Sequence, residues 1–199
     1  MCLLFETIKV KEGNFYNLQY HSERMNTSRK LLLGSENYID LKALLALPTE
    51  CSPGIFKCRI SYDHYIHKIE FEKYKSRKIK TLQLITADNI DYSYKFSDRL
   101  VFEKLKMHSD ADEILIIKKG KITDTSFSNI VFFDGKIWYT PDSPLLNGTR
   151  RQGLLDKNSI HEKKICPDDL KKFRKAKLIN AMLDIKDSPE IEMKNIFGL

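Results

Sequence analysis

Short apolar runs and polar turns alternate between residues 113 and 152. The runs are Ile114–Ile117, Asn129–Phe133 and Lys136–Thr140. Each is rich in β-branched or aromatic residues and ends near a polar, glycine or proline turn, which is typical of β-strands. Asp134 and Gly135 favour a tight hairpin, because glycine adopts positive φ freely. The pattern predicts three short strands that bracket the polar segment 123–129.

The first half of the chain predicts a mixture of strands and helices. Residues 3–10 alternate imperfectly between apolar and polar positions, as a half-buried strand does. Residues 18–33 carry apolar side chains near helical spacing and end at Gly34, a residue suited to a helix C-cap. The other elements expected here are a short helix at 38–47 and strands at 54–62, 66–74 and 79–86.

The mixture continues in the second half. Residues 87–94 are polar and irregular and resemble a linker between domains. Ser97 stands where it would cap a helix over 97–108. The remaining expected elements are a helix containing Leu154 and Leu155, a strand at 159–165, a short helix at 167–173 and a strand at 176–183.

The composition is that of a globular protein. Of 199 residues, 42% are hydrophobic and 31% charged, which argues against an intrinsically disordered chain. The apolar run Met1–Phe5 stops at Glu6, so it is too short for the core of a signal peptide or for a membrane span. The sequence therefore predicts a cytoplasmic protein with no membrane partner.

The net charge, the cysteines and the histidines bear on three possibilities: nucleic-acid binding, disulfide bonds and a metal site. The net charge of +7 suits nucleic acid or anionic metabolites. The basic clusters 73–80 and 171–177 are interrupted by apolar or aromatic residues, as on solvated faces of a strand and a helix, so we expect no nucleic-acid partner. The cysteines form no CxxC pair and are expected to be free thiols. They are Cys2, Cys51, Cys58 and Cys166. The pair His64 and His67 lacks an apparent third ligand, so no metal site is predicted.

The segment Asn147–Arg151 precedes the apolar-periodic stretch with Leu154 and Leu155. A small, donor-rich turn before a helix favours an anion, because free backbone N–H groups and the helix dipole both attract negative charge. The same residues fit an ordinary helix N-terminus equally well.

Taken together, these motifs resemble the class IV pyridoxal-phosphate-dependent aminotransferases. That family includes branched-chain and D-amino-acid aminotransferases and 4-amino-4-deoxychorismate lyase. Its signature G-x-[IV]-T-E-x-x-x-x-N-[IV]-F, then T-P, then G-[IV]-x-R corresponds here to Gly120–Phe132, Thr140–Pro141 and Gly148–Arg151. The family's opening F-E-T-[IL] and H-x-x-R correspond to Phe5–Ile8 and His21–Arg24. One departure is that Asp124 stands where the family has glutamate.

The resemblance implies an α/β protein of the D-amino-acid aminotransferase-like fold type IV. An α+β N-terminal domain would span residues 1–88, followed by a linker at 89–94. A C-terminal α/β pseudo-barrel domain that binds pyridoxal 5'-phosphate would span 95–199. The family is typically a homodimer, so we expect this chain to be one.

The resemblance also implies cofactor chemistry. Lys95, in Tyr94–Arg99, matches the family's K-x-x-[ND]-R and would hold pyridoxal 5'-phosphate as a Schiff base. Asp124 would face the pyridine nitrogen, although its side chain is one methylene shorter than glutamate. Without the resemblance, Lys95 reads as a surface lysine and Asp124 as a turn residue.

Further residues would surround the cofactor if the resemblance holds. Arg59 matches the family's phosphate-binding strand arginine. Gly148, Thr149 and Arg150 would offer backbone N–H groups to the phosphate. Asn129, Asn180 and Ala181 would lie nearby, although Asn129 also reads as a turn residue that opens a strand. His21, Arg24 and Arg151 are expected to be structural.

The implied substrate is a small amino-acid-like or chorismate-derived molecule. Three features are closer to the lyase branch and favour release of pyruvate to give 4-aminobenzoate. They are Asn147–Gly148, Arg151–Gln152 and Asn180–Met182. The alternative enzyme is a branched-chain or D-amino-acid transaminase. An alternative of another class is a catalytically degenerate member that binds pyridoxal phosphate or phosphate without turnover. Nucleic-acid binding rests on net charge alone.

Overall fold

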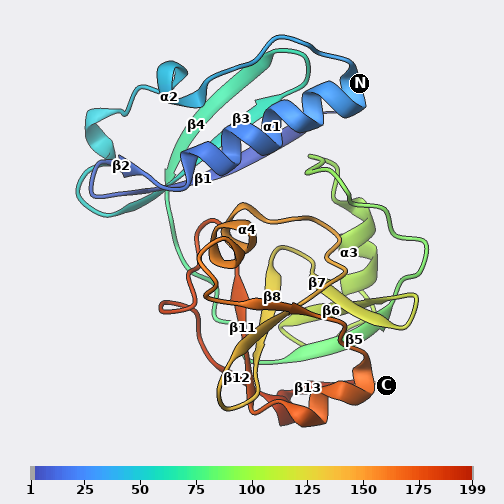
Figure 1. Ribbon diagram of the computed structural model, residues 1–199. Coiled ribbons are helices and arrows are strands. Elements are labelled where there is room, and N and C mark those ends of the chain that lie inside the picture. Colours follow the sequence, from blue (N-terminus) through green and yellow to red (C-terminus); the bar gives the residue numbers. More distant parts are fainter. Residues whose placement is uncertain (1–2, 199) are drawn as a thin grey trace. The chain divides into compact units, whose positions relative to one another are not determined.

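The computed structural model describes residues 3–198 (Figure 1). These residues divide into two compact units. The first comprises the chain up to Ser76 together with Tyr94–Asp98, and the second comprises Arg77–Ser93 and the chain from Arg99 onward. The limits differ from the expected boundaries, because the strand predicted at 79–86 lies in the second unit and the segment carrying Lys95 lies in the first.

The first unit is built on an antiparallel sheet with the strand order β2-β1-β3-β4. Its strands are β1 (Leu4–Lys11), β2 (Asn14–Phe15), β3 (Ile55–Tyr62) and β4 (Ile66–Lys73). Helix α1 (Leu18–Leu33) lies across one face of this sheet (Figure 1). Two shorter helices follow, α2 (Leu41–Leu44) and the 3₁₀ helix η1 (Thr49–Cys51).

The core of this unit lies between α1 and the sheet. Met25 of α1 packs with strand residues that include Ile8 and Ile60, and all three are fully buried. The predicted end of α1 is confirmed: Gly34 has φ +71° and its N–H donates to the carbonyl of Lys30 at 3.1 Å. The helix predicted at 38–47 is shorter, because the chain is already extended at Leu45.

The second unit contains two sheets within the described residues. One has the order β13-β5-β6-β7 and the other the order β10-β9-β8-β11-β12. The strands of the first are β5 (Leu82–Thr86), β6 (Glu113–Lys118), β7 (Lys121–Thr125) and β13 (Ile196–Phe197). Those of the second are β8 (Asn129–Phe133), β9 (Trp138–Pro141), β10 (His161–Lys163), β11 (Lys175–Ile179) and β12 (Ile191–Glu192). The helices are α3 (Leu100–Lys106), α4 (Thr149–Leu155), η2 (Pro167–Lys172) and η3 (Met193–Asn195).

Strand β8 is buried on both faces, which explains its nearly continuous apolar sequence. Ile130 and Phe132 point into the larger core, which also contains β5, β6 and β11 residues. Val131 points the other way, into a smaller core with Leu154 of α4 and Ile179 of β11. Side chains that are fitted into two separate cores resist a shift of register, because each would have to repack in the other core. The strand therefore fixes where Asn129, its first residue, lies.

Other sequence predictions need correction. The polar segment 123–129, expected to be bracketed by strands, is itself partly a strand, because β7 occupies Lys121–Thr125. Ser97 does not cap α3: the residue before the helix is Arg99, and the Ser97 N–H donates to the carbonyl of Leu3. The short helix predicted at 167–173 is confirmed and is of the 3₁₀ type, at Pro167–Lys172.

The strand predicted at 176–183 ends at Ile179. Asn180 ends it, because its Oδ1 accepts hydrogen bonds from the N–H groups of Met182 (2.9 Å) and Leu183 (3.0 Å). A side chain that satisfies the next backbone donors replaces the strand ladder with a turn.

Cys51, Cys58 and Cys166 are free thiols, as predicted. Cys2 lies outside the described residues. Among the helices of residues 3–198, none combines the length and apolar character required to cross a bilayer.

Candidate active site

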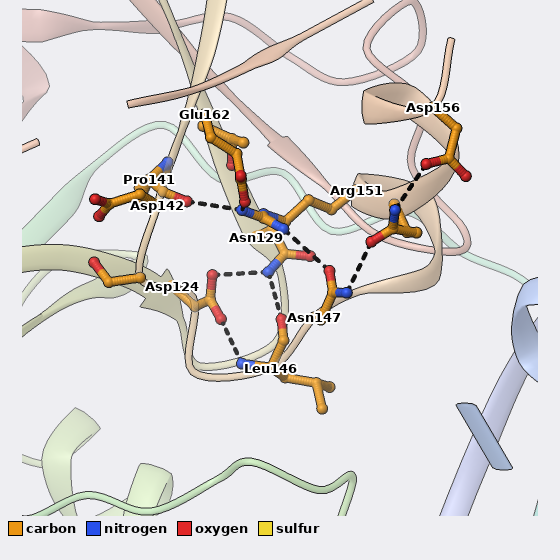
Figure 2. Close-up of polar contacts among 12 residues, drawn as sticks. Asp124, Asn129, Pro141, Asp142, Leu146, Asn147, Arg151, Asp156 and Glu162 are labelled. Carbon is orange, nitrogen blue, oxygen red and sulfur yellow. Dashed lines mark hydrogen bonds and ion pairs between the residues drawn. The ribbon is translucent and has the colours of Figure 1, made fainter. Parts of the chain in front are cut away.

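Asp124 on β7 accepts hydrogen bonds from three protein donors, and Figure 2 shows those from Asn129 and Leu146. Its Oδ2 accepts from the backbone N–H groups of Leu145 at 2.8 Å and Leu146 at 3.0 Å. Its Oδ1 accepts from Nδ2 of Asn129 at 2.8 Å. The side chain is buried, with 5% of the residue exposed. The carboxylate therefore holds the turn at 145–146 against β7.

Burial raises the pKa of Asp124 to about 6, because removal from water disfavours the charged carboxylate. The hydrogen bonds from Leu146 and Asn129 and the positive charge of Arg151 lower the pKa and oppose this effect. The group is therefore mostly ionised at neutral pH and takes up a proton just below it. Such a carboxylate can hold a positive charge on a nearby basic nitrogen.

Asn129 links Asp124 to the turn that leads into α4. Its Nδ2 also donates to the carbonyl of Leu146 at 2.9 Å. Its Oδ1 lies so close to Gly148 that a Cβ on that residue would overlap it. Gly148 is thus required by space, because the Asn129 side chain occupies the position that a Cβ would take. Thr149, the first residue of α4, is buried.

The two arginines of α4 are held by other protein groups. Arg151 donates through Nη1 to Oδ1 of Asn147 at 3.1 Å and through Nη2 to the carbonyl of Pro141 at 3.0 Å (Figure 2). It also pairs with Glu162 at 2.5 Å. These contacts support the expected structural role of Arg151. Arg150 forms an ion pair with Asp184.

In the first unit, the structure brings Lys95 and Arg59 to one aromatic ring. The Nζ of Lys95 lies 4.6 Å from the ring centroid of Phe5, and the guanidinium carbon of Arg59 lies 3.9 Å from it. Cations are attracted to the negative face of an aromatic ring at these distances. The N–H of Phe5 also donates to the carbonyl of Lys95 at 3.0 Å. The ring of Phe5, which lies on β1, thus contacts two residues that are predicted to bind the cofactor.

The next residue on β1, Glu6, ties the strand to α1. Oε2 of Glu6 lies 2.6 Å from Nδ1 of His21, and Oε1 accepts from Nε of Arg24 at 2.9 Å. Burial alone would raise the pKa of Glu6, but the charge of Arg24 and the contact with His21 bring it down to about 2. Burial lowers the pKa of His21, so the imidazole is neutral at pH 7. These contacts agree with the structural role expected for His21 and Arg24.

Asn180 and Ala181 lie in the turn after β11, next in sequence to a residue that pairs with β8. Ile179 is opposite Asn129 in that pairing. The second unit therefore places Asn180 close in register to the Asp124–Asn129 pair. Functional roles for the predicted site residues stay predictions.

Sequence reasoning missed several groups that organise the site. The N–H groups of Leu145 and Leu146 hold Asp124, but backbone donors leave no trace in the sequence. Phe5 could have been selected, because it belongs to the F-E-T motif. Arg99 belongs to the K-x-x-[ND]-R motif and donates to the carbonyl of Ser126, in the turn after Asp124.

Comparison with known proteins agrees with the fold and the motifs. The model of the family described as amino-transferase class IV matches residues 3–187. An uncharacterised protein of Haemophilus influenzae is 39% identical over 182 residues, which is 90% of this chain and 97% of that protein. A candidate aminodeoxychorismate lyase of Schizosaccharomyces pombe is 26% identical, with 89% of this chain and 85% of that protein covered.

A solved structure extends the likeness to three dimensions. It is a candidate 4-amino-4-deoxychorismate lyase from Haemophilus somnus, with 36% identity and a TM-score of 0.86. The match covers 92% of this chain and 97% of that chain. The mixed α/β architecture is that of the fold type IV enzymes, as predicted. On the family match, the motifs and this structural likeness, the chain belongs to the class IV aminotransferases, a family of pyridoxal-phosphate-dependent enzymes.

Proposed function

We propose that this chain is a pyridoxal-phosphate-dependent lyase that converts 4-amino-4-deoxychorismate into 4-aminobenzoate and pyruvate. The observation that carries the proposal is the likeness to the candidate lyase of Haemophilus somnus over nearly the full length of both chains. The Schizosaccharomyces pombe relative with the same assignment supports it. Both relatives are named for the same reaction, which favours the lyase over the transaminase alternative.

The residues present fit the cofactor. The first unit offers a lysine amine and an arginine guanidinium on the ring of Phe5. The second offers a buried carboxylate, Asp124, and a turn at Gly148 where no side chain fits. An amine, a cation, a carboxylate and backbone N–H groups are the kinds of group that bind pyridoxal phosphate.

Each group then has a role. Lys95 would attach the cofactor through Nζ, and Arg59 with the backbone of Gly148, Thr149 and Arg150 would hold its phosphate. Asp124 would stabilise a proton on the pyridine nitrogen. Its carboxylate has about four acceptor positions, so the three protein donors do not exhaust them.

When bound, pyridoxal phosphate draws electrons away from the substrate carbon that bears the amino group. The amine of Lys95 would first remove a proton from that carbon as a base and later return a proton as an acid. Asn129 would keep the Asp124 carboxylate in place. Neutral His21 and ionised Glu6 would keep β1, and with it Phe5, fixed beneath the amine of Lys95.

The test combines trapping of the cofactor with a product assay. Protein incubated with pyridoxal phosphate is reduced with borohydride and digested, and the labelled lysine is found by mass spectrometry. We expect a label at Lys95 in the wild type and none in Lys95→Ala, with Lys104→Ala, an exposed lysine on α3, as the control. Wild-type protein without a label at Lys95 would overturn the cofactor assignment.

The product assay separates the two enzyme candidates. The wild type should form 4-aminobenzoate from 4-amino-4-deoxychorismate, and Lys95→Ala should not. Amino transfer that depends on a 2-oxo acid, without 4-aminobenzoate, would assign the chain to the transaminases. A label at Lys95 with neither activity would point to the degenerate alternative.

We also propose that the enzyme is a homodimer, as the family resemblance implies. Sedimentation at micromolar concentration should give twice the monomer mass. A monomer under these conditions would contradict this assignment and leave the lyase proposal to the product assay.

A further inference from the structure

The segment Tyr94–Asp98, which carries Lys95, is an excursion of the chain out of the second unit and into the first. In the first unit it lies along β1. Two backbone hydrogen bonds hold it there. The N–H of Phe5 donates to the carbonyl of Lys95 at 3.0 Å, and the N–H of Ser97 donates to the carbonyl of Leu3 at 2.8 Å. Leu4 and Phe96 pair between them.

The two ends of this excursion meet in the second unit. Arg99, just after it, donates through Nη1 to the hydroxyl of Tyr92, just before it, at 3.1 Å. The guanidinium carbon lies 5.7 Å from the ring of Tyr92 and 4.8 Å from that of Phe102. The two rings are in edge contact at 4.7 Å, and both are buried. Arg99 thus closes the base of this excursion, here called the 93–98 loop, against a buried aromatic pair.

The same guanidinium reaches the turn that follows Asp124. Its Nη2 donates to the carbonyl of Ser126. That turn is closed by Thr125, whose N–H donates to the carbonyl of Ser128 at 2.9 Å and whose Oγ1 contacts Ser128 Oγ at 2.8 Å. Arg99 therefore ties the base of the loop to a turn that is itself fixed.

The planar guanidinium of an arginine holds the loop base to the turn better than the ammonium group of a lysine would. Charge-assisted hydrogen bonds are stronger than neutral ones. The guanidinium fork makes two at fixed angles and stacks on aromatic rings, which lysine cannot reproduce in full. A loop held at its base also loses little further entropy when its middle binds to a strand.

We propose that Arg99 is a positioning residue for Lys95. It holds the ends of the 93–98 loop together and anchors them to the turn after Asp124, so that the loop presents the lysine amine in one place. The catalytic part of this inference rests on the proposed function of Lys95. The alternative is that Arg99 only begins α3, in which case its loss would affect α3 and leave the loop unchanged.

The experiment compares Arg99→Met with Arg99→Lys and with Arg77→Met as the matched control. Arg77 is exposed, and its guanidinium carbon lies 5.5 Å from the ring of Phe127 in the same turn. Tyr92→Phe removes only the hydroxyl that Arg99 binds, so it provides a second test if Arg99→Met does not fold. Thermal unfolding first shows which variants are folded.

The first readout needs no cofactor. Hydrogen exchange is measured at the amides of Phe5 and Ser97, the two donors that hold the loop on β1. Arg99→Met should accelerate their exchange about tenfold or more, the effect of losing a charged hydrogen bond. The exchange rates in Arg99→Lys should lie between those of the wild type and Arg99→Met. Tyr92→Phe should increase the rates a few-fold, and Arg77→Met should leave them at the wild-type values.

The second readout is the rate at which borohydride traps pyridoxal phosphate on Lys95. It should fall about tenfold in Arg99→Met and recover in part in Arg99→Lys. Unchanged exchange at Phe5 and Ser97 in folded Arg99→Met, or the same acceleration in Arg77→Met, would overturn the inference. Accelerated exchange in a protein whose wild type is never trapped would instead reject the proposed function and retain the loop-holding role of Arg99.

Discussion

At the scale of single residues, Glu6 is a buried charge whose stabilisation depends on its partners. Its pKa of about 2 lies below the ordinary value of 4.5. A carboxyl group with a depressed pKa stabilises the folded state above its unfolded pKa, and this contribution is lost as the pH falls through the folded value. The Glu6 contribution is therefore complete at neutral pH and disappears between about pH 4.5 and 2.

Arg24→Met should expose this dependence, because it removes the cation that pairs with the buried Glu6 carboxylate and leaves the neutral His21 as its neighbour. We expect a loss of about 3 kcal/mol in the free energy of unfolding at neutral pH, measured by urea denaturation. The control is Lys68→Met, which removes an exposed ion pair with Glu70 and should cost less than about 1 kcal/mol. Equal losses in the two variants would contradict the prediction.

The pKa of Asp124 is shifted in the opposite direction to that of Glu6, so its contribution to stability changes with pH in the opposite way. Its pKa is raised from 3.8 to about 6, so the folded state binds a proton more tightly than the unfolded state. The free energy of unfolding should therefore fall as the pH rises from about 4 to about 6, and level off above that. The total change from this group is on the order of 3 kcal/mol.

Asp124→Asn should remove that slope, because the amide does not ionise while its oxygen can still accept from Leu145 and Leu146. Urea denaturation of both proteins at several pH values checks this. The wild type should lose stability relative to the variant between about pH 4 and 6. A difference that does not change with pH would show that Asp124 titrates normally.

Single residues also show which parts of the candidate site can be predicted from the sequence. Lys95, Asp124 and Arg59 were found because each occupies a position in a family motif; residue type alone could not separate them from the other lysines, aspartates and arginines. The motif also showed that Asp124 is shorter than the family's glutamate. It could not show that the N–H groups of Leu145 and Leu146 bind that carboxylate, because backbone donors are present at nearly every residue.

At the scale of elements, prediction succeeded where local signals and burial agree. Helix α1 combines helical spacing with a glycine C-cap, and β8 is apolar after Asn129 because it is buried on both faces. Prediction failed where a side chain satisfies nearby backbone groups. Asn180 ended β11 early in this way, and the polar side chains of β7 concealed a strand. Thr123 is an example, because its hydroxyl donates to the carbonyl of Ile116 at 2.8 Å.

The entry to α4 provides a prediction at this scale. In Gly148→Ala the new methyl group would overlap Oδ1 of Asn129, which must move and weaken its bonds to Asp124 and Leu146. We expect a loss of about 1–3 kcal/mol in the free energy of unfolding. In an Asn129→Ala background the same change should cost less than about 1 kcal/mol, since the overlapping atom is gone. Additive losses across this double-mutant cycle would count against the proposed contact.

At the scale of the whole molecule, the first unit is completed by a segment from beyond its continuous part. Tyr94 and Phe96 pack against its core, and the segment pairs with β1. A fragment that ends at Ser76 should therefore be less stable than a chimera in which a Gly/Ser linker of equal length replaces residues 77–93 and the chain continues to Asp98. Thermal unfolding followed by circular dichroism checks this, and equal midpoints would mean that the segment adds nothing to the unit.

The interleaving of the two units also sets an order of events during synthesis on the ribosome. Helix α1 and strands β1, β3 and β4 emerge first, but their unit stays incomplete until Asp98 has left the exit tunnel. Strand β5 emerges earlier than that segment and must wait for β6, which begins at Glu113. The nascent chain therefore carries one unit lacking its last piece and the first strand of another at the same time. The apolar side chains of β5 and β6 then stay exposed until β8 and β11 follow, because they share one core with Ile130 and Leu178, and exposed apolar surface of this kind is what chaperones bind.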